Sequence, residues 1–120
     1  MSFPDAVRAG LSNYAGFSGR ARRSEYWYFV LFYVAVLFAA AIVDAVLDFG
    51  FLLPVAWLAL VLPLIAVAVR RLHDTDRSGW WFLLGLVPLV GPIVLIVFYA
   101  TEGTPGDNQY GSSPQAVAYA

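Results

Sequence analysis

The chain contains no cysteine and no lysine, and its 120 residues include a single histidine, His73. Without cysteine it has no disulfide, no thiolate metal site and no cysteine nucleophile. Charged residues make up 12% of the chain and hydrophobic residues 61%. Soluble domains carry roughly 25% charged residues. This shortage of charge predicts an integral membrane protein, because so few charged side chains cannot coat a globule of this size.

The net charge of the chain is −1, which argues against a nucleic acid as the main partner. The length suits a single domain. We expect one membrane domain over residues 1–111 and a mobile tail over residues 112–120, where the composition changes to glycine, serine and proline. The segment Ser2–Asp5 has neither the positive charge nor the short apolar core of a signal peptide, so we expect none.

Three long segments carry no charged side chain. Residues 26–43, 51–69 and 80–100 are uncharged runs of 18, 19 and 21 residues. A helix that crosses a bilayer needs about 20 mostly apolar residues. The sequence therefore predicts three transmembrane helices, at about residues 26–46, 51–72 and 80–100.

A short amphipathic helix is predicted ahead of these spans, at residues 2–16. Its apolar residues recur every three to four positions, which gives the helix one apolar face. They are Phe3, Val7, Leu11 and Tyr14. This helix either packs on the rest of the protein or lies in the membrane interface, and we favour the interface. The predicted fold class is therefore all-α, with this helix and three transmembrane helices.

The third uncharged segment has two interpretations. It contains Gly85, Pro88, Gly91 and Pro92, so it is either one kinked span or a re-entrant hairpin that turns near residues 88–92. The irregular backbone of a hairpin must be shielded from lipid by protein. A protein of three helices offers little shielding, so we expect one kinked span.

With three spans, every arginine lies on one side of the membrane, on the N-terminal segment and the 70–79 loop. The other side carries only acidic residues, which are Asp44, Asp48, Glu102 and Asp107. Short loops rich in arginine stay in the cytoplasm. We therefore expect the N-terminus and the 70–79 loop to be cytoplasmic and the C-terminus to be outside.

Residues 70–80 form a polar segment between two apolar runs. A helix end, a turn and a membrane anchor explain nearly all of its residues, with Arg70 and Asp74 as an ion pair four residues apart. Asp76 or Ser78 then caps the next helix. A membrane enzyme that uses His73 is a less favoured alternative, because neighbouring helical residues do not face each other and Asp74 is not placed to orient the histidine. We assign no catalytic residue.

A binding site has more support than an enzyme active site. The planar fork of arginine suits phosphate, and basic pockets on the cytoplasmic side bind anionic lipid head groups. Arginines from two segments are expected to meet at one membrane face, beside tryptophans. The candidate site for an anionic head group or for a protein partner comprises Arg20, Arg22, Arg23, Glu25, Trp27, Arg70, Arg71, His73, Asp74, Arg77 and Trp80.

No metal site and no cofactor are predicted. Asp44 and Asp48 stand four residues apart on one helical face, but hard cations need six or more oxygen ligands. We interpret the two carboxylates as a solvated helix end.

Three short spans bury little surface against one another, so we expect a homo-oligomer or a larger membrane partner besides the lipids. An alternative function is a subunit of a small oligomeric transporter or channel, with a pathway shaped by Pro63, Pro88 and Pro92. The absence of ionisable side chains other than tyrosine from the three uncharged runs argues against an ion path.

Several motifs lie between residues 12 and 111. They are Gly19-Arg20-Ala21-Arg22-Arg23-Ser24-Glu25-Tyr26-Trp27, Arg70-Arg71-Leu72-His73-Asp74 with Ser78-Gly79-Trp80-Trp81, Pro88 with Gly91, and Gly103 to Gly106 with Asn108, Tyr110 and Gly111. Together they resemble the domain-of-unknown-function 805 family of small bacterial inner-membrane proteins. The resemblance implies a multi-pass protein of the bacterial plasma membrane, and it implies no activity.

This sequence departs from the family pattern at Asp76, where many members carry glycine. Aspartate tolerates the left-handed backbone conformation better than most residues do. We therefore expect the turn at this position to be kept.

Overall fold

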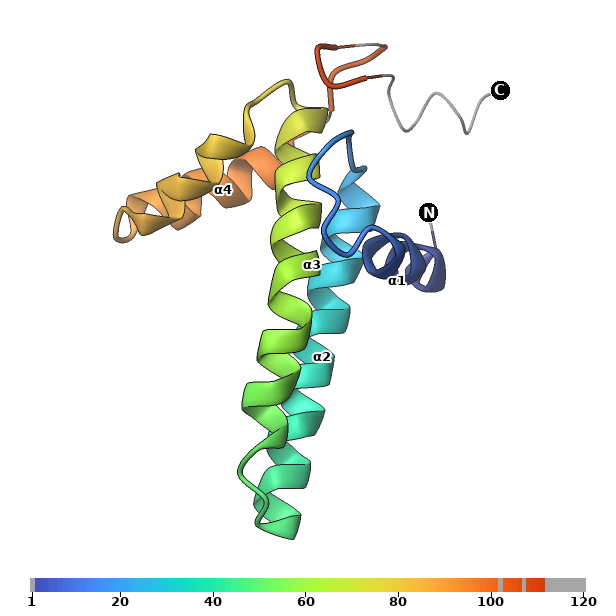
Figure 1. Cartoon of the computed structure of the whole chain (residues 1–120). Helices are drawn as coiled ribbons and strands as arrows, with labels where there is room; N and C mark the ends of the chain where they lie inside the picture. The colour runs from blue at the N-terminus through green and yellow to red at the C-terminus, as the bar shows by residue number, and fades with distance from the viewer. Residues whose placement is uncertain (1, 102, 107, 112–120) are drawn as a thin grey trace.

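A computed structural model describes residues 2–101, 103–106 and 108–111. Their regular elements are α1 (Phe3–Ser12), α2 (Arg23–Leu47), α3 (Leu52–Asp74), the 3-10 helix η1 (Gly79–Leu86) and α4 (Val90–Ala100). Figure 1 shows α2 and α3 side by side, α1 lying across them, and η1 with α4 extending sideways near the end of α3. The all-α prediction is confirmed for this part of the chain. The predicted tail, 112–120, lies outside the described residues.

The helices α2 and α3 are both long and apolar enough to cross a membrane, with 25 and 23 residues. At about 1.5 Å per residue each exceeds the roughly 30 Å of a bilayer core. Large apolar side chains such as Phe38 and Val46 lie exposed along α2, as lipid-facing residues do. These two helices coincide with the first two predicted spans. The helix α2 begins at Arg23 with Arg22 at the N-cap position.

The turn between α2 and α3 is closed by Asp44. Its two carboxylate oxygens accept hydrogen bonds from the backbone N–H groups of Leu52, at 3.0 Å, and Leu53, at 2.9 Å. These groups have no partner inside α3, because the first turn of a helix leaves its N–H groups unpaired. The interpretation of Asp44 as part of a solvated helix end is therefore wrong: it caps the next helix.

The helix α1 packs directly on α2. Its N-cap, Ser2, accepts a hydrogen bond from the N–H of Asp5, and Ala6 and Gly10 are buried on the face toward α2. A Cβ atom at Gly10 would overlap the ring of Phe29, so the two helices meet at this glycine. An N-terminal helix is present but ends at Ser12, short of the predicted 2–16, and its amphipathic role in the membrane interface stays a prediction.

A proline inside α3 is compensated by the segment after α1. Pro63 has no N–H, so the carbonyl of Ala59, four residues earlier, has no donor within the helix. The Tyr14 hydroxyl donates a hydrogen bond to this carbonyl. The side chain of Tyr14 thus ties the N-terminal segment to the point where α3 is weakest.

The expected single span over residues 80–100 is wrong. The helix η1 ends at Leu86, the chain reverses, and α4 runs back, so this segment is a hairpin. Both of its ends lie at the C-terminal end of α3: Gly79 lies against Val69, and Arg71 donates to the carbonyl of Tyr99 at 2.8 Å. The chain follows the path of the hairpin, which was the second interpretation of this segment. The described residues contain two membrane-length helices instead of three.

The tip of the hairpin is a tight, strained turn. The N–H of Val90 donates to the carbonyl of Pro88 at 2.7 Å, and Leu89 between them has φ 66° and ψ −56°. These values mark the rare γ-turn with positive φ. A Cβ atom at Gly91 would overlap the backbone of Leu84, so only glycine lets the two arms approach this closely.

Because the hairpin returns, residues 101, 103–106 and 108–111 lie at the same end of the molecule as the 70–79 loop. The N–H of Thr104 donates to the carbonyl of Asp74 at 2.7 Å, and Arg20 donates to the carbonyl of Gly106 at 2.7 Å. The expectation that the chain after residue 100 lies on the opposite side from the 70–79 loop is therefore wrong for the described residues.

Candidate functional site

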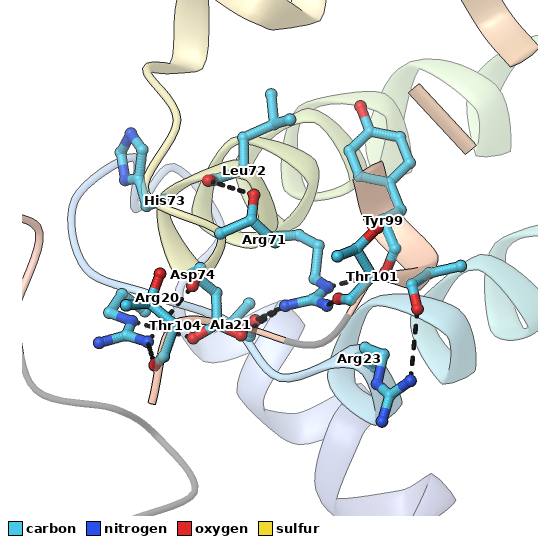
Figure 2. Close-up of polar contacts among 12 residues, drawn as sticks. Arg20, Ala21, Arg23, Arg71, Leu72, His73, Asp74, Tyr99, Thr101 and Thr104 are labelled. Carbon is cyan, nitrogen blue, oxygen red and sulfur yellow. Dashed lines mark hydrogen bonds and ion pairs between the residues drawn. The ribbon is translucent and has the colours of Figure 1, made fainter. Parts of the chain in front are cut away.

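Five charged side chains are buried together where α3 ends. Three are arginines and two are carboxylates, and each is at most 9% exposed. We call them the arginine cluster, and they are Arg20, Glu25, Arg70, Arg71 and Asp74. The cluster joins the loop before α2, the first turn of α2 and the end of α3. Figure 2 shows three of its members, Arg20, Arg71 and Asp74. Charged groups this deeply buried need partners for all of their hydrogen-bonding atoms.

Asp74 lies at the centre of the cluster. One carboxylate oxygen accepts from Nε of Arg20 at 2.9 Å, and the other accepts from Arg71. A Cβ atom at Gly103 would overlap this carboxylate, so the chain after α4 passes directly over it. The predicted ion pair between Arg70 and Asp74 is wrong, because Arg70 points toward α2 and binds Glu25 there.

Arg71 is fully buried and links three segments. Its guanidinium donates to the carbonyls of Ala21, at 3.2 Å, of Tyr99, at 2.8 Å, and of Thr101. The last two carbonyls belong to the C-terminal end of α4, where unpaired carbonyls and the helix dipole favour a positive charge. Arg71 therefore holds the returning arm of the hairpin against α3 and the loop before α2.

Arg20 holds the segment that follows the hairpin. Besides Asp74, its guanidinium donates to the backbone carbonyls of Thr104, of Gly106 at 2.7 Å and of Gly111 at 3.1 Å. Its side chain is 1% exposed. Arg20 thus acts inside the protein, and the same is true of Arg70, which binds Glu25 and the carbonyl of Gly16.

His73 is buried and oriented by a backbone carbonyl. Its Nδ1 lies 2.9 Å from the oxygen of Gly19, and the ring of Tyr110 stacks on it at 4.0 Å between centroids. A carbonyl only accepts hydrogen bonds, so Nδ1 carries the proton of the neutral ring and Nε2 is an acceptor. As expected, Asp74 does not orient the histidine. A cavity of about 540 Å³ beside His73 is lined also by Ser78 and Trp80.

The end of α3 and the start of η1 follow the capping chemistry that the sequence predicted. Asp76 has φ 61°, and its N–H donates to the carbonyl of His73, while the N–H of Arg77 reaches back to Leu72. This is a Schellman motif, whose left-handed position is usually glycine. The expected left-handed turn at Asp76 is therefore confirmed. Ser78 caps η1 by accepting from the N–H of Trp80 at 3.3 Å.

The remaining arginines of the candidate site lie nearer the surface. Arg23 is exposed and donates to the carbonyl of Ala100 at 3.3 Å, and the guanidinium of Arg77 lies 3.9 Å above the ring of Phe98. Arg22 is half-buried. Within the residues that the structure describes, none of these three arginines pairs with a carboxylate.

The two tryptophans of the candidate site differ in exposure. Trp80 is 78% exposed at the start of η1, whereas Trp27 is half-buried with its ring edge-on to Tyr26 at 5.0 Å. No group of three histidine or acidic residues that suits a metal ion occurs in the described ranges.

The structure also brings in groups that the sequence did not single out. The partners of the buried arginines are mostly backbone carbonyls, of Ala21, Tyr99, Thr101 and Thr104. A carbonyl is present at every residue and leaves no sequence signal. Gly103 was the available sequence signal that the backbone approaches the arginine cluster closely, since it belongs to the motif that runs to Gly106.

Residues 14–112 of the chain match the family described as "Protein of unknown function (DUF805)". The chain belongs to this family. It is 51% identical over 110 residues to inner membrane protein YhaI of Escherichia coli strain K12, a match that covers 88% of this chain and 91% of the relative. Inner membrane protein YhaH of the same strain is 45% identical over 111 residues, covering 88% and 92%.

A more distant relative is the uncharacterized protein YiiR of the same strain, 30% identical over 134 residues and covering 86% and 88% of the two chains. No solved structure matches the chain. Together with the two membrane-length helices, these matches confirm the prediction of a membrane protein from an uncharacterised family.

Proposed function

We propose that the chain is a binding module of the bacterial inner membrane, without enzymatic activity, that holds an anionic lipid head group at its cytoplasmic surface. The observation that carries this proposal is the pair Arg23 and Arg77. They contact Ala100 and Phe98, on either side of Tyr99, and neither pairs with a carboxylate in the described part of the chain. Two cations at one helix end, beside Trp27 and Trp81, suit a phosphate at the membrane surface.

The buried cluster fixes the position of Arg23, which is exposed, and of Arg77, which is half-buried. Arg23 begins α2 two residues after Ala21, whose N–H donates to the carbonyl of Arg70 and whose carbonyl accepts from Arg71. The chain near Arg77 is set by the Schellman turn. A head group therefore meets arginines that are already in place, which lowers the entropy lost on binding.

The proposed orientation in the membrane follows from the arginines at the end of the molecule where α3 finishes. The arginines of the loop before α2 and of the 70–79 segment lie together there, and arginine-rich short segments stay in the cytoplasm. Residues 101, 103–106 and 108–111 then lie on the cytoplasmic side as well. The relatives YhaI and YhaH are named inner membrane proteins, which supports the same membrane for this chain. We place α1 in the cytoplasmic interface, with Arg8 toward water.

The test measures lipid retention after extraction from bilayers of phosphatidylcholine and phosphatidylglycerol. A hydrogen bond to a charged group contributes about 1.5–3 kcal/mol, more than the diffuse attraction of a basic residue to an anionic surface. The variant Arg23→Gln/Arg77→Gln is therefore expected to lose about tenfold or more of the preference for phosphatidylglycerol in native mass spectrometry. Arg8→Gln/Arg22→Gln is the matched control, with the same change of charge, and keeps most of the preference. Equal preference in the Arg23/Arg77 variant and the native chain overturns the proposal.

The same spectra report the oligomeric state. A homo-oligomer or a larger partner remains a prediction, and the exposed apolar side chains of α2 suit either lipid or a second copy. A transporter subunit has no specific observation in its favour. Of the acids on α2 and α3, Glu25 and Asp74 bind arginines and Asp44 caps α3.

A further inference from the structure

A cleft separates the hairpin from the two long helices. It has a volume of about 420 Å³, and its walls come from α2, α3, η1 and α4, with Tyr26, Trp57, Ala68, Phe82 and Tyr99 among the residues that line it. Ligand sites of about 300–1,000 Å³ are typically apolar and aromatic with few polar groups.

One polar group at the cleft has no partner. Tyr99 is 4% exposed and its ring packs on that of Tyr26, with 4.4 Å between centroids. Its hydroxyl is buried and has no hydrogen-bond partner among the described residues. A buried hydroxyl without an acceptor is destabilising, and an acceptor brought by a ligand removes that penalty. The position of Tyr99 is fixed, because Arg71 binds its backbone carbonyl.

We propose that the cleft holds one acyl chain of a bilayer phospholipid, whose ester carbonyl accepts a hydrogen bond from the Tyr99 hydroxyl. This inference deepens the proposed function and rests on it for the head group. Arg23 contacts Ala100 and Arg77 packs on Phe98, so the phosphate of the same molecule lies next to Tyr99. The bilayer supplies the occupant, because one wall of the cleft belongs to the two membrane-length helices.

The experiment uses the whole chain in bilayers that contain phosphatidylglycerol or phosphatidylcholine with a photoreactive diazirine in the acyl chain. Adducts are mapped by mass spectrometry as the fraction of photoreactive lipid rises. We expect adducts at Trp57 and Ile65, in the cleft, to saturate at a low fraction. Adducts at Phe38 and Val46, which are exposed on α2, are expected to rise in proportion.

Two variants probe the site. In Gly85→Leu a side chain enters the cleft, since even a Cβ atom there lies 3.3 Å from Leu95, and the saturable adducts are expected to vanish with both lipids. Tyr99→Phe keeps the shape of the ring and removes one hydrogen bond, so saturation is expected to need about fivefold more lipid. Unchanged adducts at Phe38 show that each variant is still folded in the bilayer.

The outcomes separate the two proposals. Cleft adducts that rise in proportion in the native chain, or a Tyr99→Phe variant that saturates as the native chain does, overturn the acyl-chain inference. Absence of lipid adducts at Ile65 in the native chain, while Phe38 is labelled, also overturns it, because something other than lipid then fills the cleft. Saturable adducts that are equal for the two lipids leave the acyl chain in place and contradict the head-group proposal alone.

Discussion

The fully buried guanidinium of Arg71 donates from Nε to the backbone carbonyl of Tyr99 at 2.8 Å, and this bond joins α3 to the end of α4. The same side chain binds Asp74 and the carbonyls of Ala21 and Thr101. A buried cation that satisfies an acid and three carbonyls is hard to replace, since its loss takes a donor from each of the carbonyls and leaves Asp74 buried with Arg20. Arg71 therefore joins the returning end of the hairpin to α3 through hydrogen bonds to the carbonyls of Tyr99 and Thr101.

We expect Arg71→Met to destabilise the protein by about 3–5 kcal/mol, because it leaves the carboxylate of Asp74 buried with fewer partners. Arg71→Lys restores the charge but not the planar fork, so it recovers only part of the loss. Thermal unfolding in mild detergent measures both. An Arg71→Lys variant as stable as the native chain would show that charge alone matters and would contradict the bridging role.

The hydrogen bond from Tyr14 to the carbonyl of Ala59 predicts that the stability cost of removing the Tyr14 hydroxyl depends on Pro63. Tyr14→Phe removes the hydroxyl that donates to the carbonyl of Ala59 and is expected to cost about 1–3 kcal/mol. In a Pro63→Ala background the helix itself supplies an N–H to this carbonyl. The cost of Tyr14→Phe is then expected to fall, and a double-mutant cycle measures the difference. Equal costs in the two backgrounds count against this account.

Asp76 occupies a left-handed position that suits glycine. Asp76→Gly is expected to stabilise the fold by about 0.5–1 kcal/mol, because glycine adopts φ 61° without steric strain. Thr75→Gly is the matched control: its φ is −94°, and it is expected to be neutral or destabilising. Chemical denaturation of the two variants gives the comparison, and a destabilised Asp76→Gly variant is the contrary result.

The close approach at Gly91 predicts a steric penalty. Gly91→Ala places a methyl group on the backbone of Leu84, so we expect the arms of the hairpin to separate at a cost of about 1–3 kcal/mol. Gly85→Ala meets only the side chain of Leu95 at 3.3 Å, and a milder effect is expected. Proteolysis of the hairpin in detergent ranks the variants. If Gly91→Ala is no more sensitive than Gly85→Ala, the arms do not touch as described.

The two long helices and the left-handed turn at Asp76 could be predicted from the sequence, because uncharged runs and turn residues are local signals. The path of residues 80–100 could not be predicted from the sequence. The apolar composition of these 21 residues suits one span and a hairpin of two shorter arms equally well. Tertiary contacts decide between the two paths. Pro88 and Gly91 marked the right place for a turn, but Arg71, which binds the returning end, lies far away in the sequence.

The Gly19–Trp27 and Arg70–Trp80 segments meet as the sequence indicated, although the roles of their residues were not foreseen, and a binding site at this place stays a prediction. The charge pattern shows on which side an arginine lies, and it does not show whether that arginine is buried. Glu25 and Asp74 were a usable signal, since a carboxylate within each arginine-rich segment offers an internal partner. The contacts of Tyr99 could be found only in the structure.

The central claim is that the chain returns after the hairpin to the end where α3 finishes. The absence of cysteine from the native sequence makes a direct test simple, with spin labels on cysteines introduced at Asp76 and Pro105 in a reconstituted bilayer. A second pair joins Pro105 to Asp48, at the other end of α2. Pulsed electron paramagnetic resonance is expected to give a separation for Asp76–Pro105 well below the roughly 30 Å of the bilayer core, and a much longer one for Asp48–Pro105. A separation of about 30 Å or more for Asp76–Pro105, with a short one for Asp48–Pro105, would contradict the hairpin and restore a third span.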